Sequence, residues 1–125
     1  MKFSKNVSKQ PRKQRLALYC APLHKARSFL HCHLSKELRK REGKRAILVR
    51  KGDRVKVMRG ENKGKNAAVV EVNYKGRKVF LEGFQVTARR TKKQALVAFE
   101  PSNLLITELS ERKKKQKAKN ELQKT

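Results

Sequence analysis

The sequence predicts a small all-β core at residues 46–110, between a basic N-terminal arm at residues 1–45 and a basic tail at residues 111–125. The first observation is that the middle segment holds five of the six glycines, with its apolar residues in short runs between turn signals. The second is that the three segments carry net charges of +12, +8 and +5, which together give +25, so the middle one is the least basic for its length. Short strands of this kind suit a small closed barrel, because closure removes exposed sheet edges.

The strands can be placed one after another along the core. Residues 54–58 alternate apolar and basic side chains, which puts Val55 and Val57 on one face of a half-buried strand. Gly76 is placed to take the positive φ of a tight turn between the second and third strands. The further strands are expected at residues 67–72, 78–82, 95–99 and 104–109.

The arm is expected to be partly helical. Residues 35–43 begin with a capping serine and end at Gly43, with basic residues toward the end, which is typical of a short helix. A second helix is predicted at residues 22–30, and its docking stripe consists of Leu23, Ala26, Phe29 and Leu30. Residues 1–15 have no helical periodicity, and the tail lacks an apolar face, so we expect disorder there in isolation.

The charge excess limits the possible functions. Lys and Arg number 35 against 10 Asp and Glu, which is far more than solubility requires and indicates a polyanionic partner, nucleic acid first. The longest apolar run, residues 16–21, is too short for a bilayer span of about 20 residues. We therefore expect no membrane insertion, no secretion, and a cytoplasmic protein with reduced thiols at Cys20 and Cys32. An organellar transit peptide at residues 1–36 is the alternative, but prolines would interrupt its helix.

The loop at residues 59–65 has the composition of a phosphate-binding loop. Its two glycines allow close approach of the backbone N–H groups to a phosphate, and Arg59, Lys63 and Lys65 add positive charge. The alternative is a hairpin loop that merely carries surface lysines. The basic flanks favour nucleic acid.

The segment at residues 51–72 resembles the KOW motif, which has the pattern G-D-x-V-x-V followed by a glycine- and lysine-containing loop, with Ala67 where the motif usually has a third glycine. The flanks at residues 11–19, 21–24, 34–40 and 50–53 extend the resemblance to residues 9–110. As a whole, the chain is similar to the archaeal and eukaryotic type of a large-subunit ribosomal protein family, number twenty-four in the universal naming and twenty-six in eukaryotes.

The resemblance implies an SH3-like β-barrel that binds large-subunit ribosomal RNA early in assembly. It also implies a position near the exit of the peptide tunnel in the cytoplasmic ribosome, beside neighbouring ribosomal proteins. The motif assigns the RNA-facing loop to Arg59, Lys63, Gly64 and Lys65, and barrel positions to Val55, Val57, Val69 and Val72. KOW motifs also occur in transcription elongation factors, so an elongation or chromatin-associated protein is the alternative. Residues 1–45 are too polar and short for the second folded domain that such factors usually carry.

A second basic cluster lies at residues 89–93, between the third and fourth strands, and is either a phosphate contact or a solvated loop. The residues expected to bind RNA are Arg12, Lys13, Arg15, His24, Arg27, Arg50, Lys51, Arg54, Arg59, Lys63, Gly64, Lys65, Arg89, Arg90, Lys92 and Lys93.

The histidines and cysteines do not indicate a metal site. Cys20, His24 and the run at residues 31–33 lack the paired short spacings of structural zinc sites. We expect the cysteines to pack as small apolar residues and the histidines to face RNA or solvent. No Cys/His pair has an orienting third group, and paired carboxylates are absent from the sequence pattern. The sequence therefore favours no enzyme, no cofactor, no metal and no small-molecule substrate.

Overall fold

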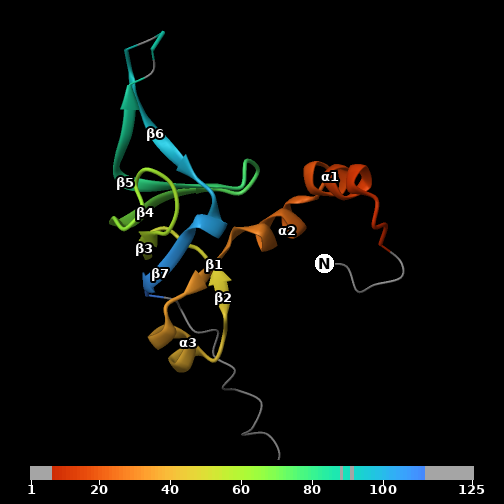
Figure 1. Cartoon of the computed structure of the whole chain (residues 1–125), viewed down its shortest axis with the longest axis horizontal. Coiled ribbons are helices and arrows are strands. Elements are labelled where there is room, and N and C mark those ends of the chain that lie inside the picture. The colour runs from red at the N-terminus through yellow and green to blue at the C-terminus, as the bar shows by residue number, and fades with distance from the viewer. Residues whose placement is uncertain (1–6, 88, 91, 112–125) are drawn as a thin grey trace, which may run out of the picture.

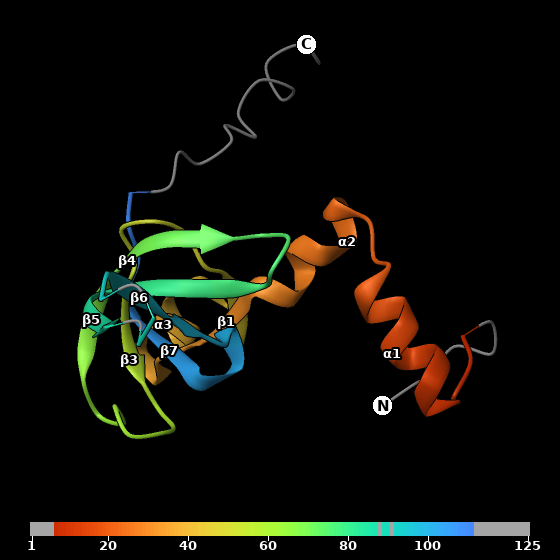
Figure 2. The same ribbon diagram turned by 90° about the horizontal axis from the view of Figure 1, so that it is seen from above.

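The structure, a computed structural model, describes residues 7–87, 89–90 and 92–111. Its elements are α1 (Pro11–Tyr19), α2 (Leu23–Ala26), the 3₁₀ helix η1 (Arg27–Leu30), β1 (His31–Leu34), α3 (Lys36–Glu42), β2 (Ala46–Leu48), β3 (Arg54–Val57), β4 (Asn66–Asn73), β5 (Lys78–Thr87), β6 (Gln94–Phe99), the 3₁₀ helix η2 (Pro101–Asn103) and β7 (Leu104–Glu108). The strands form the body of the molecule, and α1 and α2 lie to one side of it (Figures 1 and 2).

One sheet of seven strands, in the order β2-β1-β7-β3-β4-β5-β6, curls into a barrel-like core. The pairing of β1 with β7 is parallel, and the other strand pairs are antiparallel. Val55, Val57, Leu81 and Ile106 are completely buried inside it. Alternating apolar residues on twisted strands close around one interior, which confirms the predicted all-β core.

The five predicted strands are confirmed, and two further strands, β1 and β2, complete the sheet. β1 was not predicted because it is only four residues long and two of them are histidines. Its register, with His31 opposite Leu48 and His33 opposite Leu105, buries Cys32 and Leu34, so tertiary pairing outweighs local propensity. The core thus takes a strand from the N-terminal segment. The division of the chain at residue 45 stays a prediction.

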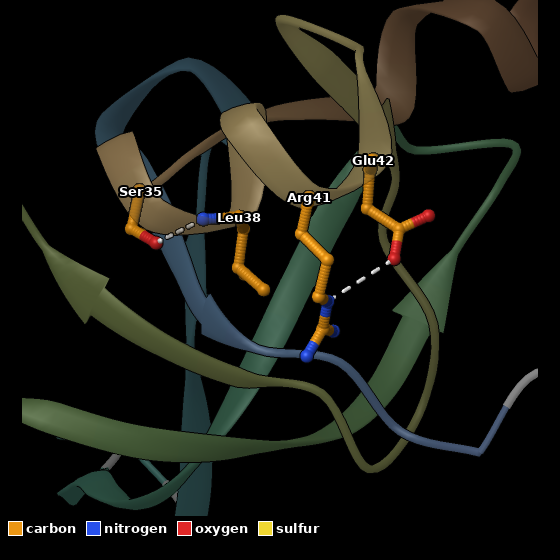
Figure 3. Close-up of polar contacts among 4 residues, drawn as sticks. All are labelled: Ser35, Leu38, Arg41 and Glu42. Carbon is orange, nitrogen blue, oxygen red and sulfur yellow. Dashed lines mark hydrogen bonds and ion pairs between the residues drawn. The ribbon is translucent and has the colours of Figure 1, made fainter.

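Helix α3 forms as the sequence predicts. The hydroxyl oxygen of Ser35 accepts a hydrogen bond of 3.4 Å from the backbone N–H of Leu38 (Figure 3). Gly43 ends the helix with φ 63°. Arg41 and Glu42 form an exposed ion pair of 3.5 Å. Leu38 is buried, which anchors the helix to the core.

The rest of the arm differs from its prediction. Residues 11–19 form helix α1, and Pro11 begins that helix instead of interrupting it, because the first position of a helix needs no N–H donor. No residue of α1 is buried. At residues 22–30 the helix is confirmed, but only Ala26 and Leu30 of the predicted docking stripe are buried, while Leu23 and Phe29 are exposed. The second half is a 3₁₀ helix, whose tighter turn redirects the side chains.

The predicted role of Gly76 is wrong. The positive φ in the turn between β4 and β5 belongs to Arg77, at 54°. Gly76 instead lies close to Asn73: a Cβ there would lie 3.2 Å from the side-chain nitrogen of Asn73, so that side chain would have to shift by a few tenths of an ångström. Asn73 Oδ1 accepts a 2.8 Å hydrogen bond from the N–H of Gly76, which fixes this approach. Ala67 lies in extended backbone within β4, so the missing third glycine of the motif causes no strain.

The two cysteines have different environments. Cys32 is completely buried, as predicted, whereas Cys20 is exposed at the end of α1, so its predicted apolar packing is wrong. Burial, with the negative charge of Asp53, raises the pKa of Cys32 from 9.0 to about 12.

We expect one fast-reacting thiol in the folded protein, Cys20, and reaction of Cys32 only on unfolding, measured with a chromogenic disulfide reagent. The pKa of Cys32 is higher in the folded protein than in the unfolded chain. The contribution of Cys32 to the free energy of unfolding is therefore complete below pH 9.0 and falls as the pH rises towards about 12. The loss is up to about 1.4 kcal/mol per pH unit, and Cys32→Ala should remove this component of the alkaline slope. Cys20→Ser is the control for the fast phase. Two fast thiols in the folded wild type would contradict the burial of Cys32.

Candidate nucleic-acid interface

The residues predicted to bind RNA are all exposed, and they fall mainly into three places. The first is the side of the core that faces the arm, the second is the loop between β3 and β4, and the third is the tip of the hairpin formed by β5 and β6. The three places lie on different sides of the barrel-like core (Figures 1 and 2). A partner that met all three would have to be large.

The β3–β4 loop has a defined shape set by its glycines. Gly60 and Gly64 both have φ of 89°, in the region that L side chains rarely adopt. The N–H of Gly64 donates to the carbonyl of Val57 at 2.8 Å, and that of Lys63 donates to Gly60 at 3.1 Å. The expectation that glycine N–H groups meet a phosphate therefore fails at Gly64. For Gly60 and for the cationic side chains of the loop, contact with a phosphate stays a prediction.

Lys65 connects the loop to the base of the hairpin. Its ammonium nitrogen bonds Asn62 Oδ1 at 3.0 Å and lies 5.7 Å from the centre of the Phe84 ring. Phe84 packs edge to face on Phe99, with ring centres 5.2 Å apart. The aromatic pair thus holds one cation of the loop beside the start of the projecting hairpin.

The β5–β6 hairpin projects away from the core and carries the second predicted cluster (Figure 1). β5 bends at Gly83, whose φ is 79°, and its register with β6 shifts between Phe80 and Gln85. Beyond the bend, β5 pairs with β6 alone. In the part of the tip that the structure describes, the basic residues are Arg89, Arg90, Lys92 and Lys93, none with an ion-pair partner among described residues.

On the side of the arm, the structure brings three predicted residues together in one groove of about 600 Å³. Arg27 comes from η1, while Arg50 and Lys51 come from the connection between β2 and β3. Glu71 of β4 and Tyr74 of the next turn line the same groove. Sequence reasoning missed these last two residues. The available signal was an aromatic residue in an otherwise basic turn, which is typical of surfaces that stack nucleobases.

Arg77, another residue that sequence reasoning missed, ties α1 to the core. Its guanidinium donates a 2.8 Å hydrogen bond to the carbonyl of Leu18, and lies 5.8 Å from the ring centres of both Tyr19 and Phe29. This contact sets the C-terminal end of α1 against the β4–β5 turn. The basic residues Arg12, Lys13 and Arg15 therefore stand on a helix whose C-terminal end contacts the core.

Other predicted residues stand apart. Arg54 pairs with Glu108 at 3.5 Å and shares a groove with Glu82 and Glu108, so acidic groups lie close to its charge. His24 is exposed on α2. In the described part of the chain, no three His, Cys, Asp or Glu side chains gather to hold a metal ion. None of the described helices is long and apolar enough to cross a membrane.

A barrel-like β core whose exposed loops and arm carry separate groups of cations defines a protein built to bind a polyanion. Over residues 8–121 the sequence matches the family described as the eukaryotic ribosomal proteins L26 and their archaeal L24-type counterparts. The chain belongs to this family, which confirms the resemblance seen in the sequence and makes it an RNA-binding, structural protein of the large ribosomal subunit.

Proposed function

We propose that the chain binds large-subunit ribosomal RNA through its arm, its β3–β4 loop and its hairpin tip. In this proposal it supports early assembly of the subunit in the cytoplasm and lies near the peptide exit tunnel, next to other ribosomal proteins. It acts by binding and not by catalysis. Membership of the ribosomal family supports this function over a role in transcription elongation or chromatin.

We also propose that residues 46–110 form an SH3-like barrel of the KOW type. Support comes from the order of the strands: β3, β4, β5 and β6 follow one another as antiparallel neighbours, and β7 returns to pair with β3. A 3₁₀ turn, η2, separates β6 from β7. The KOW-like segment at residues 51–72 covers β3, the basic loop and most of β4.

The single observation that carries the RNA proposal is the placement of cations in exposed groups that point away from one core. Each phosphate neutralised by a lysine or arginine releases counterions, so affinity falls steeply with salt. Folded RNA offers its backbone more readily than its base edges, so contacts of this kind recognise shape. Several separated contacts would fix the orientation of the protein on one RNA surface.

We expect Lys63→Glu combined with Lys65→Glu to lower affinity for a large-subunit ribosomal RNA fragment at least about tenfold at moderate salt. Both side chains are exposed, so circular dichroism should show an unchanged fold. Lys36→Glu with Lys40→Glu is the matched control, since it reverses two exposed charges on α3, outside the predicted sites. Unchanged affinity of the loop variant would move the main contact to the arm. A wild-type affinity that does not respond to salt would contradict RNA binding through phosphates.

A further inference from the structure

The groove beside the arm has the composition of a nucleotide site more than that of a simple phosphate contact. Its volume of about 600 Å³ lies within the roughly 300–1,000 Å³ of pockets that bind small organic groups. Three cations, Arg27, Arg50 and Lys51, reach it from two separate segments of the chain. One carboxylate, Glu71, and one aromatic ring, Tyr74, share it with them.

The charged side chains of this groove are not engaged with one another. Within the described residues, no side-chain hydrogen bond or ion pair is formed by Arg27, Arg50, Lys51 or Glu71. A carboxylate accepts hydrogen bonds and repels phosphate, so it would weaken a site that bound phosphate alone. Glu71 is explained if the ligand brings hydrogen-bond donors together with its negative charge. A nucleobase attached to its phosphates does this.

Tyr74 supplies the flat surface that a base requires. It is 41% exposed, which leaves part of its side chain open to solvent. The ring lies in the turn between β4 and β5, which Arg77 ties to α1. Bases stack on aromatic rings held at a fixed position, and single-stranded segments of RNA present bases for this.

We propose, on the basis of the RNA-binding function above, that this groove holds one unpaired guanine of an RNA strand. Tyr74 stacks on the base, and the carboxylate of Glu71 accepts from N1–H and the N2 amino group. Guanine is the natural base whose Watson–Crick edge places two donors side by side, which matches the two acceptor oxygens of a carboxylate. Arg27, Arg50 and Lys51 neutralise the phosphates on either side of that nucleotide.

The chain allows this to be tested directly by fluorescence. It has two tyrosines and no tryptophan, so Tyr19→Phe leaves Tyr74 as the main emitter. The full chain carrying Tyr19→Phe is titrated with the RNA pentamers UUGUU, UUAUU and UUUUU at a salt concentration that suppresses non-specific binding. We expect UUGUU to quench Tyr74 and to bind at least about 5-fold more tightly than the other two pentamers.

Glu71→Gln should abolish the preference for guanine: the affinity for UUAUU and UUUUU should rise slightly, because one negative charge is removed, and the affinity for UUGUU should fall to their level. Glu82→Gln is the matched control: it makes the same change in charge on β5, where the side chain lines a different groove. Its guanine preference should equal that of the parent. Tyr74→Leu should lower the affinity for UUGUU at least about 5-fold, measured by anisotropy of a labelled oligonucleotide.

Binding without Tyr74 quenching, or with equal affinity for the three pentamers, overturns the guanine site while RNA binding stands. Equal effects of Glu71→Gln and Glu82→Gln on the preference also overturn it. Quenching by free guanosine monophosphate at the same concentrations as by UUGUU overturns it in favour of a free-nucleotide site. Absence of binding to the pentamers and to the ribosomal RNA fragment alike overturns both the site and the proposed function.

Discussion

Asp53→Ala is expected to lower the free energy of unfolding by about 3–5 kcal/mol. The Asp53 side chain is completely buried, and its two carboxylate oxygens join distant parts of the chain. One oxygen accepts from the N–H of Arg50 at 2.8 Å, and the other accepts from the N–H and the hydroxyl of Ser110 at 2.9 and 2.8 Å. Alanine leaves these donors without their acceptor inside the protein. Since domains of this kind have only about 5–15 kcal/mol in total, the variant loses much of its stability.

Urea unfolding followed by circular dichroism measures this loss. Ser110→Ala is the matched comparison, because it removes one hydroxyl and keeps the backbone N–H, so we expect a loss of only about 1 kcal/mol. Should Asp53→Ala be too unstable to purify, Asp53→Asn keeps one acceptor oxygen and should lie between the two. A loss below about 1 kcal/mol for Asp53→Ala would show that the carboxylate does not hold these segments together.

Replacing Arg12, Lys13 and Arg15 together by alanine is expected to weaken binding to a large-subunit ribosomal RNA fragment by about 100-fold near physiological salt. The three side chains are exposed on α1, whose C-terminal end Arg77 fixes to the core. If each of them neutralises one phosphate, the slope of log affinity against log salt should become less negative by about 3. Alanine favours helix, so α1 should persist.

The control for this variant removes the same charge from another exposed helix. Lys36, Lys40 and Arg41 of α3, replaced by alanine, lie outside the predicted contacts and should change the salt slope by much less. Equal effects of the two triple variants would mean that only net charge matters. That result would contradict a specific contact by α1.

The parts of the fold that the sequence predicted well are those with strong local signals. The strand at residues 54–58 is predicted by the alternation of its side chains, and α3 is predicted by its serine and glycine caps. Both signals depend only on residues close in sequence, and the structure contains both elements as expected. β1 has no such signal, because its burial depends on pairing with β2 and β7. α1 was missed for a related reason: it buries nothing, so no apolar periodicity marks it.

The candidate site shows the same limit. Charge identified the groups of basic residues, since a surplus of cations is visible in composition. One groove holds Arg27 together with Arg50 and Lys51 because η1 packs against the β2–β3 connection. Local sequence does not encode this packing. Glu71 and Tyr74 are not basic, so an argument from positive charge does not find them. Their relevance follows only from the residues that the fold brings beside them.

The parallel pairing of β1 with β7 delays completion of the sheet during synthesis of the chain. His33 lies opposite Leu105, so β1, which is made first, waits for β7, the last of the seven strands that the structure describes. At about 5–20 residues per second, several seconds pass between the two. Closing so long a loop is slow, because its entropy must be lost before the contact forms. The emerging N-terminal part therefore spends that interval without its final neighbours, and it is available to the chaperones and nucleic acids of the cell before the barrel-like core exists.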